Sequence, residues 1–194
     1  MKILITGFEP FAGRARNGSL TLARALGGKT IAGAEVVYEC LPVVWDGFSE
    51  LIQVTLRAHR PDLFLGMGEG SKTYACFEWI GKNHTNPEAR DNDGKPPAAD
   101  ILEPGGPYLR KATLDFERDW VEGLPIQVAN SENAGNYLCN HLLYSGLGLA
   151  KIPFGFLHLP IQGEADDADY CSTWFPLLFR LLSKNVRIIE EASR

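Results

Sequence analysis

One cysteine of this sequence lies where a nucleophile would be useful. Cys139 follows a short apolar segment that ends near Ala129 and a stretch of small and polar residues at 131–136, and a helical pattern covers 134–147. We therefore expect Cys139 in the early turns of a helix, where exposed amides and the helix dipole favour a thiolate. The same amides are able to stabilise an oxyanion. Position alone does not separate this interpretation from a buried structural cysteine in an amphipathic helix.

His158 is the histidine best placed to act as a general base. It lies near the end of an apolar stretch, Gly-Phe-Leu-His-Leu-Pro at 155–160, and a strand that ends there would bring the ring to the edge of a sheet where ligands bind. On its own, a core histidine with satisfied hydrogen bonds is the better explanation of the residue. The other three histidines are weaker candidates: His59 ends a helix, His84 lies in a polar loop, and the side chain of His141 diverges from that of the nearby cysteine.

Glu78 is a carboxylate inside an apolar stretch, Ala-Cys-Phe-Glu-Trp-Ile at 75–80. A buried carboxylate is costly unless it has a partner, and the second ring nitrogen of a histidine is such a partner. Cysteine, histidine and an acid together make a catalytic triad, which is defined by geometry and not by sequence order. The structural alternative is an outward-facing strand residue, which the alternation of the stretch permits.

These residues need a scaffold, and the hydrophobic pattern predicts strands that alternate with helices. The expected strands cover 2–6, 35–41, 62–66, 74–80, 126–129 and 154–159. The expected helices cover 19–26, 45–59, 116–121, 134–147 and 168–189, with Ser19, Asp46, and Ser131 or Asn133 as candidate caps. The polar stretch at 81–107 is long for a loop in a compact domain, and such loops are often functional.

This order predicts an α/β fold, a three-layer α/β/α sandwich with a mainly parallel or mixed central sheet, in one domain over residues 1–194. We expect four apolar strands among the central ones: 2–6, 62–66, 126–129 and 154–159. Ligands bind at the carboxyl ends of the strands in such sheets. The site is therefore expected in the segments that follow Thr6, Gly66, Ala129 and Leu157.

The composition of the 194 residues is that of a globular protein, with 45% hydrophobic and 22% charged residues and a net charge of −5. This charge, without any dense basic run, argues against nucleic acid as a partner. No apolar run approaches the length of a membrane helix, so no membrane partner is expected. The cysteines show no metal-type spacing, and without a secretory signal we expect reduced thiols and a cytoplasmic protein. A homo-oligomer is compatible with the sequence, which does not give the oligomeric state.

Four separated motifs give the chain a resemblance to the pyroglutamyl peptidase I family. They are Gly-Phe-Glu-Pro-Phe at 7–11 followed by Asn17, Phe-Glu-Trp-Ile-Gly-Lys-Asn at 77–83, Ala-Gly-Asn-Tyr-Leu-Cys-Asn-His at 134–141, and the histidine motif at 155–160. Each is weak alone, but their number and order make the similarity specific, and it extends from about residue 2 to the final helix.

The resemblance implies a cysteine peptidase that removes an N-terminal pyroglutamyl residue from peptides, with an α/β/α fold and neither cofactor nor metal. The catalytic residues carried over are Glu78, Cys139 and His158. Phe8 and Phe11 would enclose the lactam ring, with Tyr137 and Leu138 lining the same pocket. Apolar walls suit a flat, small and uncharged ring.

Two segments depart from the family pattern. Members of the family have the sequence Arg-Ile-Pro-Asp-Asn-x-Gly at the position of residues 88–94, which are Glu-Ala-Arg-Asp-Asn-Asp-Gly in this chain. Glu88 thus stands at the family arginine, and we expect the loop to shift so that Arg90 points towards Cys139 as oxyanion support. In the second segment, Glu69 places an acidic charge near the expected site and would favour a substrate with a nearby positive group.

The sequence also suggests three other functions. The glycines at 66, 68 and 70 resemble a nucleotide-binding loop, but a third glycine of the fingerprint is replaced by Ser71 and a strand pattern follows in place of a helix. A phosphorylase-like sugar-phosphate enzyme of a related fold is a better rival, since it would use a glycine-rich phosphate loop. A non-catalytic binder of modified peptide N-termini is the third possibility.

Overall fold

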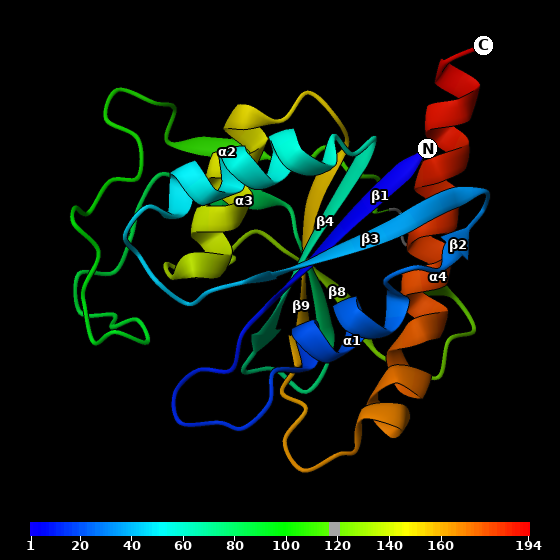
Figure 1. Ribbon diagram of the computed structural model, residues 1–194, viewed down its shortest axis with the longest axis horizontal. Coiled ribbons are helices and arrows are strands. Elements are labelled where there is room, and N and C mark those ends of the chain that lie inside the picture. The colour runs from blue at the N-terminus through cyan, green and yellow to red at the C-terminus, as the bar shows by residue number, and fades with distance from the viewer. Residues whose placement is uncertain (117–120) are drawn as a thin grey trace.

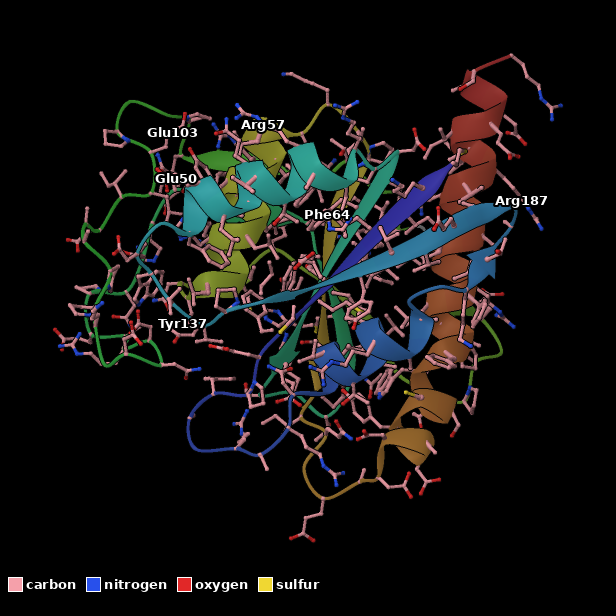
Figure 2. All side chains as sticks on the ribbon, viewed as in Figure 1. Glu50, Arg57, Phe64, Glu103, Tyr137 and Arg187 are labelled. Carbon is pink, nitrogen blue, oxygen red and sulfur yellow. The ribbon has the colours of Figure 1, made fainter. Side chains whose placement is uncertain are left out.

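A computed structural model describes residues 1–116 and 121–194. Most of the short helix expected at 116–121 lies outside the described residues. Strands and helices largely alternate before residue 63 and after residue 131, whereas the described residues between them contribute strands and loops, and one hydrophobic core joins these elements. In Figure 2 the side chain of Phe64 lies at the centre of this core, while those of Arg57 and Arg187 lie at the periphery.

Seven strands of the described chain form one sheet in the order β2–β3–β1–β4–β9–β5–β8. Their bounds are β1 Lys2–Phe8, β2 Thr30–Ile31, β3 Ala34–Leu41, β4 Leu63–Gly70, β5 Ala75–Glu78, β8 Val128–Ser131 and β9 Phe154–Pro160. The central strands are apolar along nearly their whole length because helices cover both faces. This is the α/β fold with a mixed sheet that the sequence predicts.

The direction of the strands divides the sheet into two parts. Strands β3, β1, β4 and β9 are parallel to one another. Strand β5 pairs antiparallel with β9, and β8 pairs parallel with β5. The prediction that 126–129 is a central strand was wrong, since β8 lies at the edge of the sheet. Its carboxyl end also points away from the edge at which β1, β4 and β9 end, so the site is built at the ends of those three strands.

Two helices cover each face of the sheet (Figure 1). Helices α1 (Gly18–Leu26) and α4 (Asp167–Ala192) pack together on one face, and α2 (Phe48–His59) and α3 (Leu138–Leu149) pack together on the other. The expected capping residues were wrong. Asn17, rather than Ser19, caps α1, and α2 begins after Gly47 in a left-handed conformation without a side-chain cap. None of the helices in the described ranges is both long and apolar enough to cross a membrane.

The long polar segment leaves the sheet beside α2 and α3 (Figure 1). It starts at β6 (Ile80–Lys82), which pairs antiparallel with β7 (Leu109–Lys111). Asp91 holds its middle part by accepting hydrogen bonds from the amides of Trp45, Asp93 and Lys95. The segment is therefore anchored to the body of the molecule.

Candidate active site

Strand β4 and helix α3 bring Cys139 against the sheet. Gly68 of β4 faces the sulfur so closely that a Cβ on this glycine would lie 2.8 Å from Sγ of Cys139. Gly66 makes similar room for Leu142 one turn further along α3, and for Phe156 of β9. The glycines at 66, 68 and 70 belong to β4 and not to a loop. Their role is to let α3 and β9 pack closely, so the likeness to a nucleotide-binding loop was misleading.

Helix α3 starts later than the sequence suggested and places Cys139 in its first turn. Tyr137 is the N-cap residue in an extended conformation, and no side chain caps the helix. The helix expected from 134, with Ser131 or Asn133 as cap, was therefore wrong at its start. The first bond within the helix runs from the amide of His141 to the carbonyl of Tyr137. The amides before it, including that of Cys139, point out of the helix N-terminus, where they favour a negative sulfur or oxyanion.

His158 and Glu78 meet across the antiparallel pair of β9 and β5. Nδ1 of His158 lies 2.8 Å from Oε1 of Glu78, and the exposed fractions of the two side chains are 16% and 3%. Cys76 is the direct partner of His158 in the strand register, and Glu78 is the partner of Phe156, so the carboxylate reaches the ring along the sheet. The other ring nitrogen, Nε2, is not taken by Glu78, and the sulfur of Cys139 lies near enough to the ring to raise its pKa.

The charges of this group of three residues are coupled. Burial by itself lowers the pKa of His158, but Cys139 as a thiolate and the hydrogen-bonded Glu78 carboxylate outweigh burial and raise this pKa to about 10. Beside a thiolate, the ring is therefore held as an imidazolium. An imidazolium beside the sulfur and a helix N-terminus behind it both stabilise a thiolate.

A cavity of about 120 Å³ opens beside the sulfur. Its walls are mainly apolar and include the four residues that the sequence predicted for a lactam pocket, together with two of the three predicted catalytic residues: Phe8, Phe11, Val43, Ala134, Tyr137, Leu138, Cys139 and His158. The cavity also reaches Asn17 and Glu69. The structure therefore brings together every predicted site residue except Arg90.

Aromatic packing fixes the walls of the cavity. Phe8 is buried and stacks on Phe48 of α2, with ring centroids 6.1 Å apart. Phe11 packs against Tyr137 at 6.1 Å, and Tyr137 meets Trp45 edge to face at 5.1 Å. Burial, with the charges of Asp91 and Cys139, raises the pKa of Tyr137 to about 12, so the phenol stays neutral. In Figure 2 this tyrosine lies between the sheet and the long loop.

Glu69 lies at the site but its charge is compensated. Its side chain is 1% exposed, and Oε1 accepts hydrogen bonds from the amides of Gly18 at 2.7 Å and Gln162 at 2.9 Å. Oε2 lies 3.2 Å from the guanidinium of Arg14, which also stacks over the ring of Phe11. An arginine and the N-terminus of α1 already balance the carboxylate, which argues against the expectation that Glu69 attracts a positive substrate group.

The long loop reaches the site through its backbone. The guanidinium of Arg90 donates to the carbonyl of Pro87 at 3.0 Å, and Arg90 is not among the residues that line the cavity. Its own carbonyl accepts a hydrogen bond from the hydroxyl of Tyr137 at 2.8 Å. Glu88 is exposed. The loop thus positions the tyrosine, and a catalytic role of the Arg90 side chain stays a prediction.

Three supporting residues were not assigned to the cysteine site from the sequence. Gly68 shows as a glycine inside a strand pattern, which signals a close approach of another group. Asn140 is fully buried and connects α3 to β6. Its Oδ1 accepts a hydrogen bond from the backbone amide of Lys82, and its Nδ2 donates one to the carbonyl of the same lysine. Arg14 had no distinguishing sequence signal. No group of three or more His, Cys, Asp or Glu residues in the described part of the chain is arranged to hold a metal ion.

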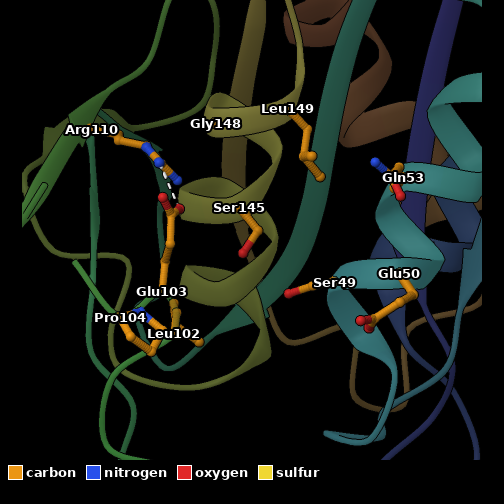
Figure 3. A pocket seen from close by; sticks show the side chains of 10 residues that line it. All are labelled: Ser49, Glu50, Gln53, Leu102, Glu103, Pro104, Arg110, Ser145, Gly148 and Leu149. Carbon is orange, nitrogen blue, oxygen red and sulfur yellow. Dashed lines mark hydrogen bonds and ion pairs between the residues drawn. The ribbon is translucent and has the colours of Figure 1, made fainter. Parts of the chain in front are cut away.

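A separate cavity of about 420 Å³ lies between α2, α3 and the segment before β7 (Figure 3). The ion pair of Arg110 and Glu103, 2.7 Å apart, forms one wall. Ser49 on the opposite wall lies 2.9 Å from Nε2 of His141, but Nδ1 of this buried histidine has no partner among the described residues. This serine and histidine lack the acid that orients a base, so the cavity does not repeat the arrangement around Cys139.

The family of this chain follows from its similarity to known proteins. A family model described as "Pyroglutamyl peptidase" matches residues 1–176. The chain belongs to the pyroglutamyl peptidase family. A pyrrolidone-carboxylate peptidase of Streptococcus suis is 35% identical over 175 residues, which cover 84% of this chain and 80% of that protein. A pyrrolidone-carboxylate peptidase of Pyrococcus furiosus is 33% identical over 175 residues, with 84% and 83% coverage.

Solved structures of pyroglutamyl peptidases share the fold. Pyrrolidone carboxyl peptidase from Thermococcus litoralis superposes with a TM-score of 0.85 at 25% identity, covering 98% of this chain and 96% of that one. Pyroglutamyl peptidase I from Bacillus amyloliquefaciens gives 0.82 at 26% identity, with 94% and 93% coverage. The resemblance seen in the four sequence motifs is confirmed over nearly the whole chain.

Proposed function

We propose that this chain hydrolyses the bond after an N-terminal pyroglutamyl residue through a thioacyl-enzyme, with Cys139 as nucleophile, His158 as acid and base, and Glu78 as the group that orients the histidine. Membership in the pyroglutamyl peptidase family supports the reaction. The observation that carries the residue roles is the hydrogen bond between the Glu78 carboxylate and the His158 ring, together with the place of Cys139 and His158 in the wall of the same small, mainly apolar cavity.

The first half of the reaction forms the thioacyl-enzyme. The thiolate of Cys139 attacks the carbonyl carbon that links pyroglutamate to the next residue, so a carbon–sulfur bond forms and the carbonyl oxygen becomes negative. The amide of Cys139 at the start of α3 is placed to stabilise that oxygen. The carbon–nitrogen bond then breaks as His158 gives its proton to the departing amine.

The second half regenerates the enzyme. A water molecule that occupies the position of the amine loses a proton to His158 and attacks the thioester, which releases pyroglutamate and restores the thiolate–imidazolium pair. Glu78 keeps its charge throughout and holds the ring in one tautomer, with Nε2 facing the sulfur.

The cavity explains why the substrate carries a lactam. Glu69 is the carboxylate on its wall, and Arg14 and two amides already bind it. An uncharged ring therefore fits without loss of solvation, whereas the charged ammonium and side-chain carboxylate of an N-terminal glutamate would have to be desolvated. A proline ring has a similar shape but carries a charged amine, which disfavours it for the same reason.

The discriminating experiment compares three fluorogenic substrates: the pyroglutamyl, prolyl and glutamyl derivatives of aminomethylcoumarin. We expect turnover of the first only, and rapid inactivation by iodoacetamide with the label on Cys139. A phosphorylase-like enzyme would lack this turnover, and a non-catalytic binder would bind the pyroglutamyl compound without releasing coumarin. Equal turnover of all three would show that the cavity does not select the lactam.

The compartment is part of the proposal. All four cysteines are unpaired. A thiolate nucleophile needs reducing conditions, which are those of the cytosol. We therefore place the activity in the cytoplasm, on peptides with an N-terminal pyroglutamate.

A further inference from the structure

A second cavity touches the catalytic histidine from its other side. It holds about 220 Å³ and is lined by Lys72, Tyr74, Cys76, Glu78, Asn133 and His158, among others. We call it the Lys72 cavity. It shares His158 and Ala134 with the cavity beside the sulfur of Cys139, which we call the lactam cavity. Cys139 and the two phenylalanines of the first loop do not line the Lys72 cavity. The imidazole ring therefore stands between the two cavities.

The steps of the reaction indicate which part of the substrate lies on each side of the His158 ring. The pyroglutamyl group must lie with its carbonyl at Cys139, which is in the lactam cavity. The departing amine must lie close enough to His158 to receive its proton. The peptide that continues from this amine then starts at the ring and leads away from the lactam cavity, which places the residue after pyroglutamate in the Lys72 cavity.

Positive charge borders this cavity. The ammonium of Lys72 lies 3.5 Å from Sγ of Cys76 and 5.4 Å from the centre of the Tyr74 ring, so it is held over the cavity wall. A second ammonium, that of Lys82, does not line the cavity and donates to the side-chain oxygen of Asn133, which does, at 3.1 Å.

The negative charge of the cavity is already neutralised. Glu78 contributes the carboxylate, and it is bound to the His158 imidazolium through Oε1. Its Oε2 is buried and has no partner among the described residues. Glu132, next to Asn133 in the chain, is not among the residues that line the cavity. A carboxylate on the substrate thus meets the ammonium of Lys72, and the only acid among the described residues of the cavity wall is the histidine-bound Glu78.

We infer that the Lys72 cavity binds the residue that follows pyroglutamate and prefers a residue bearing a carboxylate there: Glu or Asp in a longer peptide, or the terminal carboxylate of a pyroglutamyl dipeptide. This inference rests on the proposed function and adds the substrate class to it. Lys72 is its specificity-determining residue. The ammonium is exposed to solvent, so the preference over an uncharged isostere is roughly threefold to fivefold and decreases as salt is added.

The test measures kcat/KM for three peptides that differ only after pyroglutamate, with Glu, Gln or Lys at that position. The readout is the ratio of Glu to Gln within each enzyme variant, which cancels any general change in activity. We expect the ratio to fall to about one in Lys72→Ala, and the Lys peptide to become the best of the three in Lys72→Glu. Lys151→Ala, which removes an exposed lysine away from both cavities, is the matched control and retains the wild-type ratio.

The outcomes separate this inference from the proposed function. Wild-type enzyme that releases coumarin from the pyroglutamyl substrate but shows equal rates for the Glu, Gln and Lys peptides would overturn the subsite alone. A Glu preference that Lys72→Ala leaves intact would also overturn it. Failure of the wild-type enzyme to cleave any pyroglutamyl substrate would overturn both.

Discussion

At the scale of single side chains, Glu78 and Cys139 both raise the pKa of the His158 ring. The contribution of Glu78 to this pKa can be measured separately from its effect on bond cleavage. A raised pKa keeps the ring protonated, so the acid step is lost only as the pH rises through about 10. Replacing the carboxylate removes one cause of the raised pKa, and the alkaline limb of the pH profile must then move to lower pH.

We therefore expect Glu78→Gln to lower kcat by roughly 100-fold or more, with measurable residual activity, because the amide holds the ring in a poorer orientation. The pH dependence of kcat/KM checks the electrostatic part. An alkaline limb at the same pH in Glu78→Gln and in the wild-type enzyme would show that the carboxylate does not set the charge of the histidine.

Arg90 is the residue for which sequence and structure give different expectations. Oxyanion support predicts a loss of about 100-fold in Arg90→Ala. The bond of its guanidinium to the carbonyl of Pro87 predicts a loss below about tenfold, because the backbone carbonyl that anchors Tyr137 is kept. Single-turnover acylation rates decide between them, with Glu88→Ala as a control that changes little. A loss near 100-fold would show that the arginine turns inwards when substrate binds.

The elements show which parts of the site the sequence was able to predict. The choice of Glu78, Cys139 and His158 needed the four motifs together, because each residue alone also fits a structural role, and their catalytic roles stay a prediction. The start of α3 was not predicted, since small residues at 134–136 fit the helical pattern although the helix begins at Leu138. The edge position of β8 was not predicted because the apolar pattern of a strand does not state which neighbours it has.

The loop after β1 gives a prediction at the scale of elements. Arg14 connects this loop to β4 by pairing with Glu69 and by stacking on Phe11, and so holds the aromatic wall over the lactam cavity. Without Arg14 the wall is held less firmly and the cavity binds the lactam more weakly. We expect Arg14→Ala to raise KM for the pyroglutamyl substrate by roughly threefold to tenfold while kcat changes less.

Arg16→Ala is the matched control for Arg14. Arg16 lies in the same loop but bonds the carbonyl of Ala165 and is 3.6 Å from Asp167, on the side of α4. Kinetic constants of the two variants that agree within error would contradict the positioning role of Arg14.

For the whole molecule, His141 predicts how stability depends on pH. This histidine is 7% exposed, between the rings of Trp45 and Phe48, and burial lowers its pKa to about 4. The unfolded chain has the ordinary value of about 6.5 and so binds the proton first as the pH falls. The neutral ring thus contributes full stability above about pH 6.5, and this contribution is lost as the pH falls towards 4.

We expect the free energy of unfolding to decrease between about pH 7 and about pH 5 more steeply in the wild-type protein than in His141→Gln, by up to ~1.4 kcal/mol per pH unit. Urea unfolding of both proteins at the two pH values measures this double difference, in which the other histidines cancel. Parallel pH dependences would mean that the buried ring is not the group that titrates.

The central claim is that the sulfur of Cys139 attacks the pyroglutamyl carbonyl. Its most direct test is the rate of coumarin release from pyroglutamyl-aminomethylcoumarin by wild-type enzyme, by Cys139→Ala, and by Cys40→Ala as a control thiol on β3. We expect Cys139→Ala to lose at least ~1,000-fold in kcat while Cys40→Ala keeps the wild-type rate. Release by Cys139→Ala at the wild-type rate would contradict the claim.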